Sequence, residues 1–161
     1  MAELHPSVAA LAPLLGVWAG QGKGVYPTID PFEYFEEVTF GHVGKPFLHY
    51  AQKTKTVSDG RPLHAETGYL RVPAADRIEL ILAHPTGVTE IAEGTLSLGD
   101  ATIEVELVAT TIGRSASAKE VTALGRSIRV DGGELTYTVH MGAVGQPLQQ
   151  HLTATLQRKL P

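Results

Sequence analysis

The chain has 161 residues, of which 43% are hydrophobic and 19% charged, a composition typical of one folded domain and unlike that of a disordered chain. Its formal net charge is -4 and it contains no block of lysines and arginines, which argues against a nucleic-acid-binding surface and against an anionic-membrane surface. It has no cysteine, so disulfides, thiolate nucleophiles and cysteine-ligated zinc or iron–sulfur centres are excluded.

The N-terminal residues show no basic segment followed by an apolar one, as a secretory signal would. No apolar run approaches the roughly 18 residues that a membrane-spanning helix needs. We therefore expect a cytoplasmic protein without a membrane partner.

The first predicted element is a short helix over residues 6–15. This stretch is apolar and rich in alanine; Pro6 suits the first turn of a helix, and Pro13 limits its length. We expect it to act as a plug or cap on the rest of the domain.

The remainder of the chain predicts β-strands. Apolar and polar residues alternate over residues 77–82, 102–109 and 134–141, which is the period of a strand with one face buried and the other in water. Turn-forming residues separate the runs at 58–60, 73–76, 85–87, 99–100 and 131–133.

These spacings predict about ten antiparallel strands joined mainly by short hairpins. Such a series must close on itself or protect its edges, and an up-and-down β-barrel is the simplest solution. A barrel of roughly eight strands can already hold one small ligand, and ten strands enclose more space. A two-sheet sandwich is the structural alternative.

The most specific local pattern is GxWxGxG, formed by Gly16, Trp18, Gly20 and Gly22. Glycines at alternate positions remove the side chains from one face of the first strand, which permits tight curvature and close approach of another backbone. Trp18, the only tryptophan, can then close one end of the barrel. We interpret the motif as structural.

With this motif the chain resembles the nitrobindins. Further similar segments follow in the order of that family over residues 4–158: 26–29 (Tyr-Pro-Thr-Ile), 37–40 (Glu-Val-Thr-Phe), 44–46 (Gly-Lys-Pro), 52–54 (Gln-Lys-Thr), 64–69 (His-Ala-Glu-Thr-Gly-Tyr) and 147–152 (Pro-Leu-Gln-Gln-His-Leu). The resemblance implies one nitrobindin-like domain over residues 1–161.

The resemblance also implies a lipocalin-like or fatty-acid-binding-like barrel of ten strands with one ferric haem b near its mouth. The family's axial iron ligand is the histidine after the Pro-Leu-Gln turn, which here is His151. The implied activity is the isomerisation of peroxynitrite to nitrate, with binding of nitric oxide. The implied partners are thus haem and small anionic or diatomic nitrogen-oxide ligands; assembly into a homodimer is left open.

The residues alone select His151 less sharply. A haem iron needs a neutral imidazole or a similar donor, and the chain offers seven histidines, two methionines and a few tyrosines. His151 also has the strand parity of Thr153 and Thr155, opposite the apolar Leu152 and Ala154. Either the last strand presents a polar face to the pocket, or a β-bulge resets the parity near its start.

Four further residues are predicted to bind the cofactor. Met141 shares the apolar face of its strand, where a thioether could contact the porphyrin. The resemblance places His64 at the border of the distal pocket and Lys119 where a cation meets a haem propionate, and it makes Thr28 a pocket candidate. Each also has a plainer interpretation: core filling for Met141 and ordinary solvation for the others.

Other kinds of site find little support. No two histidines have the i,i+2 or i,i+4 spacing of a simple zinc site, so a metal site without porphyrin is not predicted. The chain contains no GxSxG motif, so a hydrolase is not predicted.

Two functions compete with a haem isomerase. One is a carrier of a hydrophobic ligand, although the arginine–tyrosine arrangement that binds a carboxylate cannot be identified in the sequence. The other is a haem or nitric oxide sensor without turnover. On the enzyme hypothesis, iron carries the chemistry and the barrel supplies binding, orientation and access.

Overall fold

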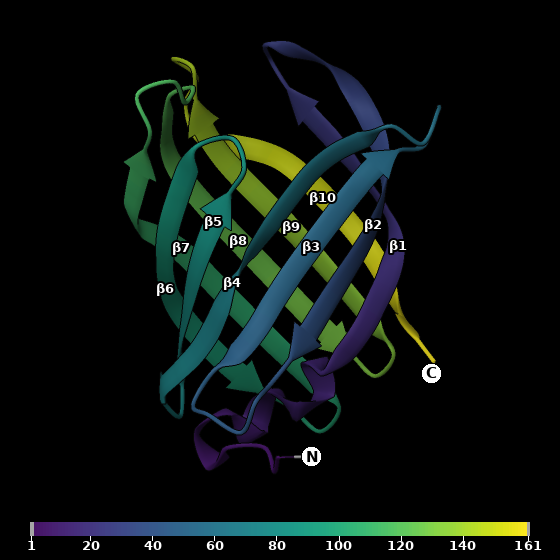
Figure 1. Cartoon of the computed structure of the whole chain (residues 1–161), viewed down its shortest axis with the longest axis vertical. Helices are drawn as coiled ribbons and strands as arrows, with labels where there is room; N and C mark the ends of the chain where they lie inside the picture. Colours follow the sequence, from purple (N-terminus) through teal and green to yellow (C-terminus); the bar gives the residue numbers. More distant parts are fainter. Residues whose placement is uncertain (1, 161) are drawn as a thin grey trace.

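A short 3-10 helix, η1, and ten antiparallel strands make up the computed structural model (Figure 1), which describes residues 2–160. Residues 1 and 161, which the expected single domain also includes, lie outside the described residues. The elements are η1 (Pro6–Leu14), β1 (Gly16–Tyr26), β2 (Ile29–Gly41), β3 (Leu48–Thr56), β4 (Pro62–Ala74), β5 (Arg77–His84), β6 (Val88–Leu98), β7 (Thr102–Arg114), β8 (Val121–Asp131), β9 (Glu134–Ala143) and β10 (Gln149–Lys159).

The strands form a closed barrel in which each strand pairs with its neighbours in sequence and β1 also pairs with β10. The prediction of a ten-stranded antiparallel up-and-down barrel is therefore confirmed, and the sandwich alternative is wrong. Closure satisfies the strand edges that an open sheet would expose, and it leaves two ends of different character.

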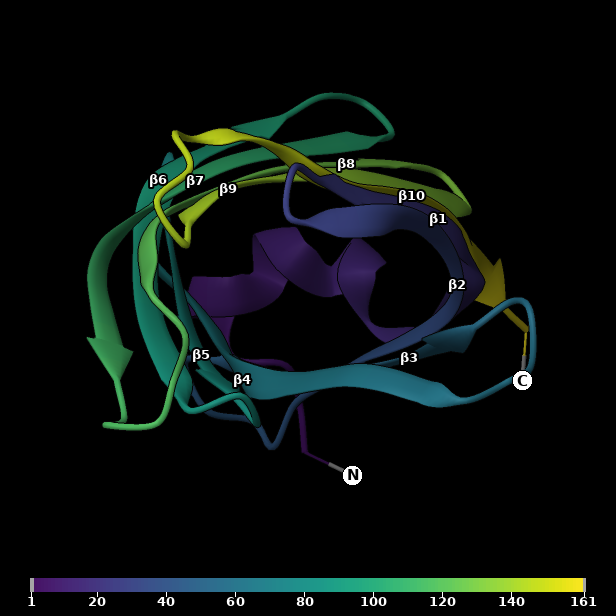
Figure 2. The same ribbon diagram turned by 90° about the horizontal axis from the view of Figure 1, so that it is seen from above.

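The helix η1 covers one end of the barrel, as the view along the barrel shows (Figure 2). Val8, Leu11 and Leu14 are buried on its inner side, so the predicted N-terminal helix is confirmed. It is a 3-10 helix, and Pro13 lacks the N–H that an α-helical bond to the carbonyl of Ala9 would require. We call this the closed end, and the opposite end the open end.

Trp18 joins η1 to the barrel wall. Its side chain is fully buried, and its indole Nε1 donates a hydrogen bond to the Leu14 carbonyl at 2.8 Å. The guanidinium of Arg158 lies 4.3 Å from the centroid of the Trp18 ring and donates to the carbonyls of Leu15, at 2.6 Å, and Pro13. This stacked cation and the indole fasten the closed end.

The glycines of the GxWxGxG motif occupy places where a side chain does not fit. A Cβ atom at Gly20 would lie 2.2 Å from the carbonyl oxygen of Thr155 on β10, and one at Gly22 would lie 2.3 Å from the ring of Tyr34 on β2. Because these glycines have no side chain, β1 can curve closely against both of its neighbours, β2 and β10.

The barrel interior changes from apolar to polar along its axis. Beside η1 it is filled by buried side chains including Ile78, Val130 and Leu156. Towards the open end it contains the buried polar residues Glu36, Gln52, Glu66 and Glu90. Within residues 2–160, no helix has the length and apolar character needed to cross a membrane.

Replacing Gly20 by alanine should lower the free energy of unfolding by about 1–3 kcal/mol, because the added methyl group must displace the β10 backbone. Chemical denaturation of the wild type and the variant measures this change. Gly41→Ala is the matched control, since a Cβ at that strand position meets nothing within 4 Å. Equal losses of stability in the two variants would contradict the steric explanation.

Candidate haem pocket at the open end

His151 lies at the open end of the barrel, in a β-bulge of β10. Gln150 pairs with His140 and Leu152 pairs with Val139, so His151 is the extra residue between two regular pairs. The bulge is thus the explanation for its parity: Ala154 and Leu156 remain buried while His151 is turned from the regular alternation.

The surroundings of His151 define which of its nitrogens is free. Its Nδ1 lies 2.9 Å from the carbonyl oxygen of Val25, which can only accept, so Nδ1 carries the proton and Nε2 presents its lone pair. Burial lowers the pKa of His151, the bond to Val25 opposes this, and nearby His64 lowers the pKa further. A neutral imidazole with its second nitrogen fixed by a carbonyl is the form that ligates metal.

Aromatic side chains hold the His151 ring in place. The ring of Tyr26 meets it edge to face with centroids 5.3 Å apart, and that of Phe32 lies 6.5 Å away. The Tyr26 hydroxyl accepts a hydrogen bond from the Ala143 N–H at 2.8 Å and can donate to the Met141 carbonyl at 3.2 Å. Tyr26 therefore ties the ends of β1 and β9 together across the bulge of β10.

The available space restricts where a porphyrin could bind. The cavity inside the barrel has a volume of about 60 Å³, far below the roughly 300–1,000 Å³ of ordinary ligand pockets. This cavity is too small for a porphyrin, which makes the open end the candidate site. Exposed apolar side chains are found in the segments around that end, at Val25, Ile29, Leu63, Val144 and Leu148. A neutral histidine beside apolar surface fits haem.

The other residues predicted to bind the cofactor also lie towards the open end. Thr28 is exposed in the turn between β1 and β2, and Met141 is half-buried near the end of β9. Lys119 is exposed in the loop between β7 and β8. That loop contacts the segment leading to His151, because the N–H of Val144 donates to the Glu120 carbonyl at 3.0 Å. His64, near the start of β4, belongs to a polar cluster.

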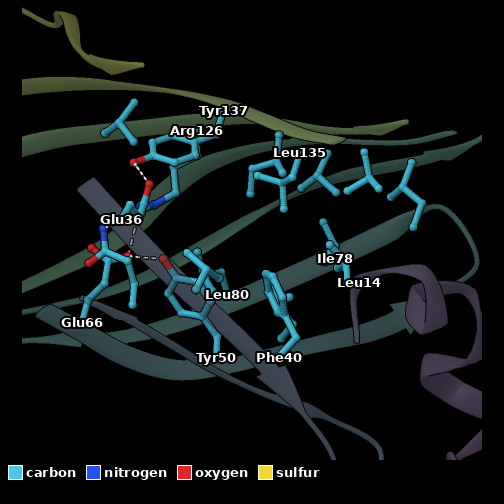
Figure 3. A pocket seen from close by; sticks show the side chains of 18 of the residues that line it. Leu14, Glu36, Phe40, Tyr50, Glu66, Ile78, Leu80, Arg126, Leu135 and Tyr137 are labelled. Atoms are coloured by element: carbon cyan, nitrogen blue, oxygen red, sulfur yellow. Dashed lines mark hydrogen bonds and ion pairs between the residues drawn. The ribbon is translucent and has the colours of Figure 1, made fainter. Parts of the chain in front are cut away.

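A polar layer separates this end from the apolar core (Figure 3). Figure 3 shows Glu36, Glu66, Arg126 and Tyr137 gathered at one end of the cavity, with Leu14 at the other. Glu36 accepts hydrogen bonds from Tyr137 and from Gln52, each at 2.7 Å. Burial raises the pKa of Glu36 to about 7, although these two hydrogen bonds oppose the shift.

A second part of the layer is ionic. Arg126 contacts Glu66 at 3.5 Å and also pairs with Glu90. Burial would raise the pKa of Glu66, but Arg126 and the neighbouring histidines outweigh it and bring the pKa to about 2. The Tyr50 hydroxyl donates to Glu66 at 2.9 Å. The interior thus contains an arginine, Arg126, near a tyrosine, Tyr50. The guanidinium of Arg126 already pairs with the carboxylates of Glu66 and Glu90, which leaves little support for a carrier that binds the carboxylate of a fatty acid.

Several of these residues were not singled out from the sequence: Tyr26, Phe32, Glu66, His84, Glu90 and Arg126. A usable signal existed for the carboxylates. Glu36 has the strand parity of the buried Val38 and Phe40, and Glu66 that of the buried Leu70. A charged residue in the apolar register of a strand indicates a buried polar site. No comparable signal in the sequence marks the Val25 carbonyl, because its contact with His151 arises only when β1 pairs with β10.

Comparison with known proteins agrees with this geometry. A family model described as THAP4-like, heme-binding beta-barrel domain matches residues 7–158. The chain is 66% identical to peroxynitrite isomerase 2 of Mycobacterium marinum over 158 residues, covering 98% of each chain. It is 59% identical to peroxynitrite isomerase of Nocardia farcinica over 155 residues, covering 96% of this chain and 92% of the relative.

A solved structure shows the same fold. The crystal structure of Rv2717c from M. tuberculosis superposes with a TM-score of 0.96 at 59% identity, covering 98% of this chain and 100% of that one. The match extends over the closed end, the barrel and the segment that contains His151. This chain belongs to the THAP4-like family of heme-binding beta-barrel domains.

Proposed function

We propose that the chain binds one haem b at the open end through His151 and isomerises peroxynitrite to nitrate at the ferric iron. The observation that carries the proposal is the half-buried, neutral His151, whose Nδ1 is held by the Val25 carbonyl at 2.9 Å. Relatives with 59–66% identity named peroxynitrite isomerase support the choice of reaction.

The reaction makes few demands on the protein. Peroxynitrite and nitrate contain the same atoms and carry the same charge, so no net proton or electron is exchanged. Bound haem supplies an open coordination position on ferric iron. The chain's own residues have to hold the cofactor, orient the His151 ring and shield one porphyrin face from water; no side chain is needed as general acid or base.

The remaining roles follow from position. We assign Lys119 to contact with a haem propionate and Met141 and Thr28 to the wall of the haem pocket. We assign His64 to the border of the distal pocket, on the face of the haem opposite His151. Met141 and His64 are half-buried, whereas Thr28 and Lys119 are exposed. The same open iron position would bind nitric oxide, and the chain would act as one domain over residues 1–161. A cytoplasmic location and a homodimer stay predictions from the sequence.

Replacing His151 by alanine should remove the iron–nitrogen bond while leaving the apolar surface at the open end. Wild type and variant are loaded with ferric haem, and their absorption spectra and the decay of added peroxynitrite are recorded. We expect an altered iron spectrum and a decay no faster than that caused by free ferric haem. His49→Ala is the control, because the exposed ring of His49 is hydrogen-bonded to the side chain of Thr67, away from the open end.

Two results would contradict the proposal separately. Identical iron spectra in wild type and His151→Ala would remove His151 as the ligand. A haem-loaded wild type that leaves peroxynitrite decay unchanged would remove the isomerase and leave a haem-binding or sensing protein.

Replacing Lys119 by alanine should weaken haem retention only slightly. An exposed ion pair contributes about 0–1 kcal/mol, which corresponds to at most about a fivefold increase in the haem dissociation constant. Transfer of haem to an acceptor protein measures this change. Lys45→Ala is the matched control, since Lys45 is also exposed but lies between β2 and β3 at the closed end. A loss of haem more than about fivefold larger than in Lys45→Ala would contradict an exposed ion pair, and a haem-bound structure with Lys119 away from both propionates would contradict the contact itself.

A further inference from the structure

Three potential metal ligands meet inside the barrel near the open end. His64 and Glu66 alternate on β4, and His84 ends the neighbouring strand β5. The Nε2 of His64 lies 3.2 Å from Oε1 of Glu66 and 3.3 Å from Nδ1 of His84, and this Nδ1 lies 3.6 Å from the same Glu66 oxygen. One atom from each residue thus forms a nearly equilateral triangle.

The size of this triangle matches tetrahedral coordination. Zinc binds nitrogen and oxygen at about 2.0–2.1 Å in protein sites, which places the ligand atoms of a tetrahedron roughly 3.4 Å apart. The three observed separations, from 3.2 to 3.6 Å, bracket that value. Two histidines and one carboxylate leave a fourth position for water or a small anion.

The ligands also have the outer partners that metal sites use. The Nε2 of His84 lies 2.8 Å from Oε1 of Glu90, which makes a carboxylate–histidine pair pointing Nδ1 at the centre of the triangle. The second oxygen of Glu66 accepts from the Tyr50 hydroxyl at 2.9 Å and contacts Arg126 at 3.5 Å. His84 and Glu66 are therefore oriented before any ion binds.

The arrangement brings two acceptors towards one donor, because Nε2 of His64 lies within hydrogen-bond distance of both Oε1 of Glu66 and Nδ1 of His84. If His84 donates from Nε2 to Glu90, its Nδ1 presents a lone pair towards the Glu66 carboxylate. Glu66 and Glu90 carry two formal negative charges, Arg126 carries one positive charge, and the side chains of the two glutamates are only 6% and 0% exposed; a second positive charge has to come from a protonated His64 or His84, or from a bound cation. A cation at the centre of the triangle would satisfy both features, and the 31% exposure of the His64 side chain provides access.

We propose that His64, Glu66 and His84 bind a divalent transition-metal ion in tetrahedral geometry, at a site distinct from His151. The ion would be one with a preference for nitrogen and oxygen ligands at this spacing, such as Zn²⁺ or Co²⁺. Sequence spacing does not reveal the site, because the second histidine comes from the neighbouring strand.

The test is titration of Zn²⁺ into the full-length chain, in its haem-free form and after loading with ferric haem, which occupies His151. We expect one zinc ion per chain in both forms, and a visible absorption band of tetrahedral Co²⁺ when cobalt replaces zinc. His64→Ala should weaken zinc binding by more than about 100-fold, since even the loss of an outer partner costs about 10–100-fold.

Controls separate the site from other histidines and from misfolding. His49→Ala and, in the haem-free form, His151→Ala should bind zinc like the wild type. His64 is the preferred position for substitution because it is partly exposed, and thermal unfolding verifies that the variant folds; His64→Gln serves as a second variant that keeps the polarity.

A wild-type chain that takes up no zinc, or a His64→Ala chain that binds it as tightly as the wild type, would show that the cluster is only a hydrogen-bonded network. Loss of zinc binding in His151→Ala, or in the haem-loaded chain alone, would overturn the separation of the two sites. The haem-free titration remains decisive even if the chain takes up no haem.

Discussion

The pairing of β1 with β10 is the contact on which both ends of the molecule depend. It closes the barrel, and its register runs from Val17 opposite Lys159 to Gly24 opposite Leu152. Near one end of this seam Arg158 stacks on its register partner Trp18, and just beyond the other end His151 reaches the Val25 carbonyl. The glycines of β1 let the two strands approach closely, so a motif near the N-terminus sets the position of His151 near the C-terminus.

The polar layer shows how the barrel tolerates charge in its interior. An isolated buried carboxylate or guanidinium would be strongly destabilising, so such groups need both charge pairing and hydrogen bonds. Glu66 and Glu90 share Arg126, whereas Glu36 relies on Tyr137 and Gln52. Burial raises the pKa of Glu36 because its two neutral partners offset it only in part, while Arg126 and the neighbouring histidines lower the pKa of Glu66.

Sequence reasoning predicted most of the fold and only part of the site. Alternation and turn residues predicted the strands because both are local consequences of backbone geometry, and Pro6 and Pro13 bounded the helix for the same reason. His151 was singled out by resemblance, and its parity allowed a bulge without requiring one. The partners of His151 and the meeting of His64 with His84 depend on which strands become neighbours and in what register, which no local pattern encodes.

The two histidine sites at the open end are built in different ways, and this has a consequence for their specificity. His151 stands alone in a bulge, its second nitrogen bonded to a backbone carbonyl that no side-chain substitution removes. In the proposed function it would offer one donor to a haem, which brings its other four ligands with it. The His64 cluster stands on regular strands, where alternation places His64 and Glu66 on one face and pairing adds His84. Three converging donors suit a bare ion, whose coordination sphere the protein must supply. If both proposals hold, the irregular strand and the regular strands favour different kinds of metal centre within one opening of the barrel.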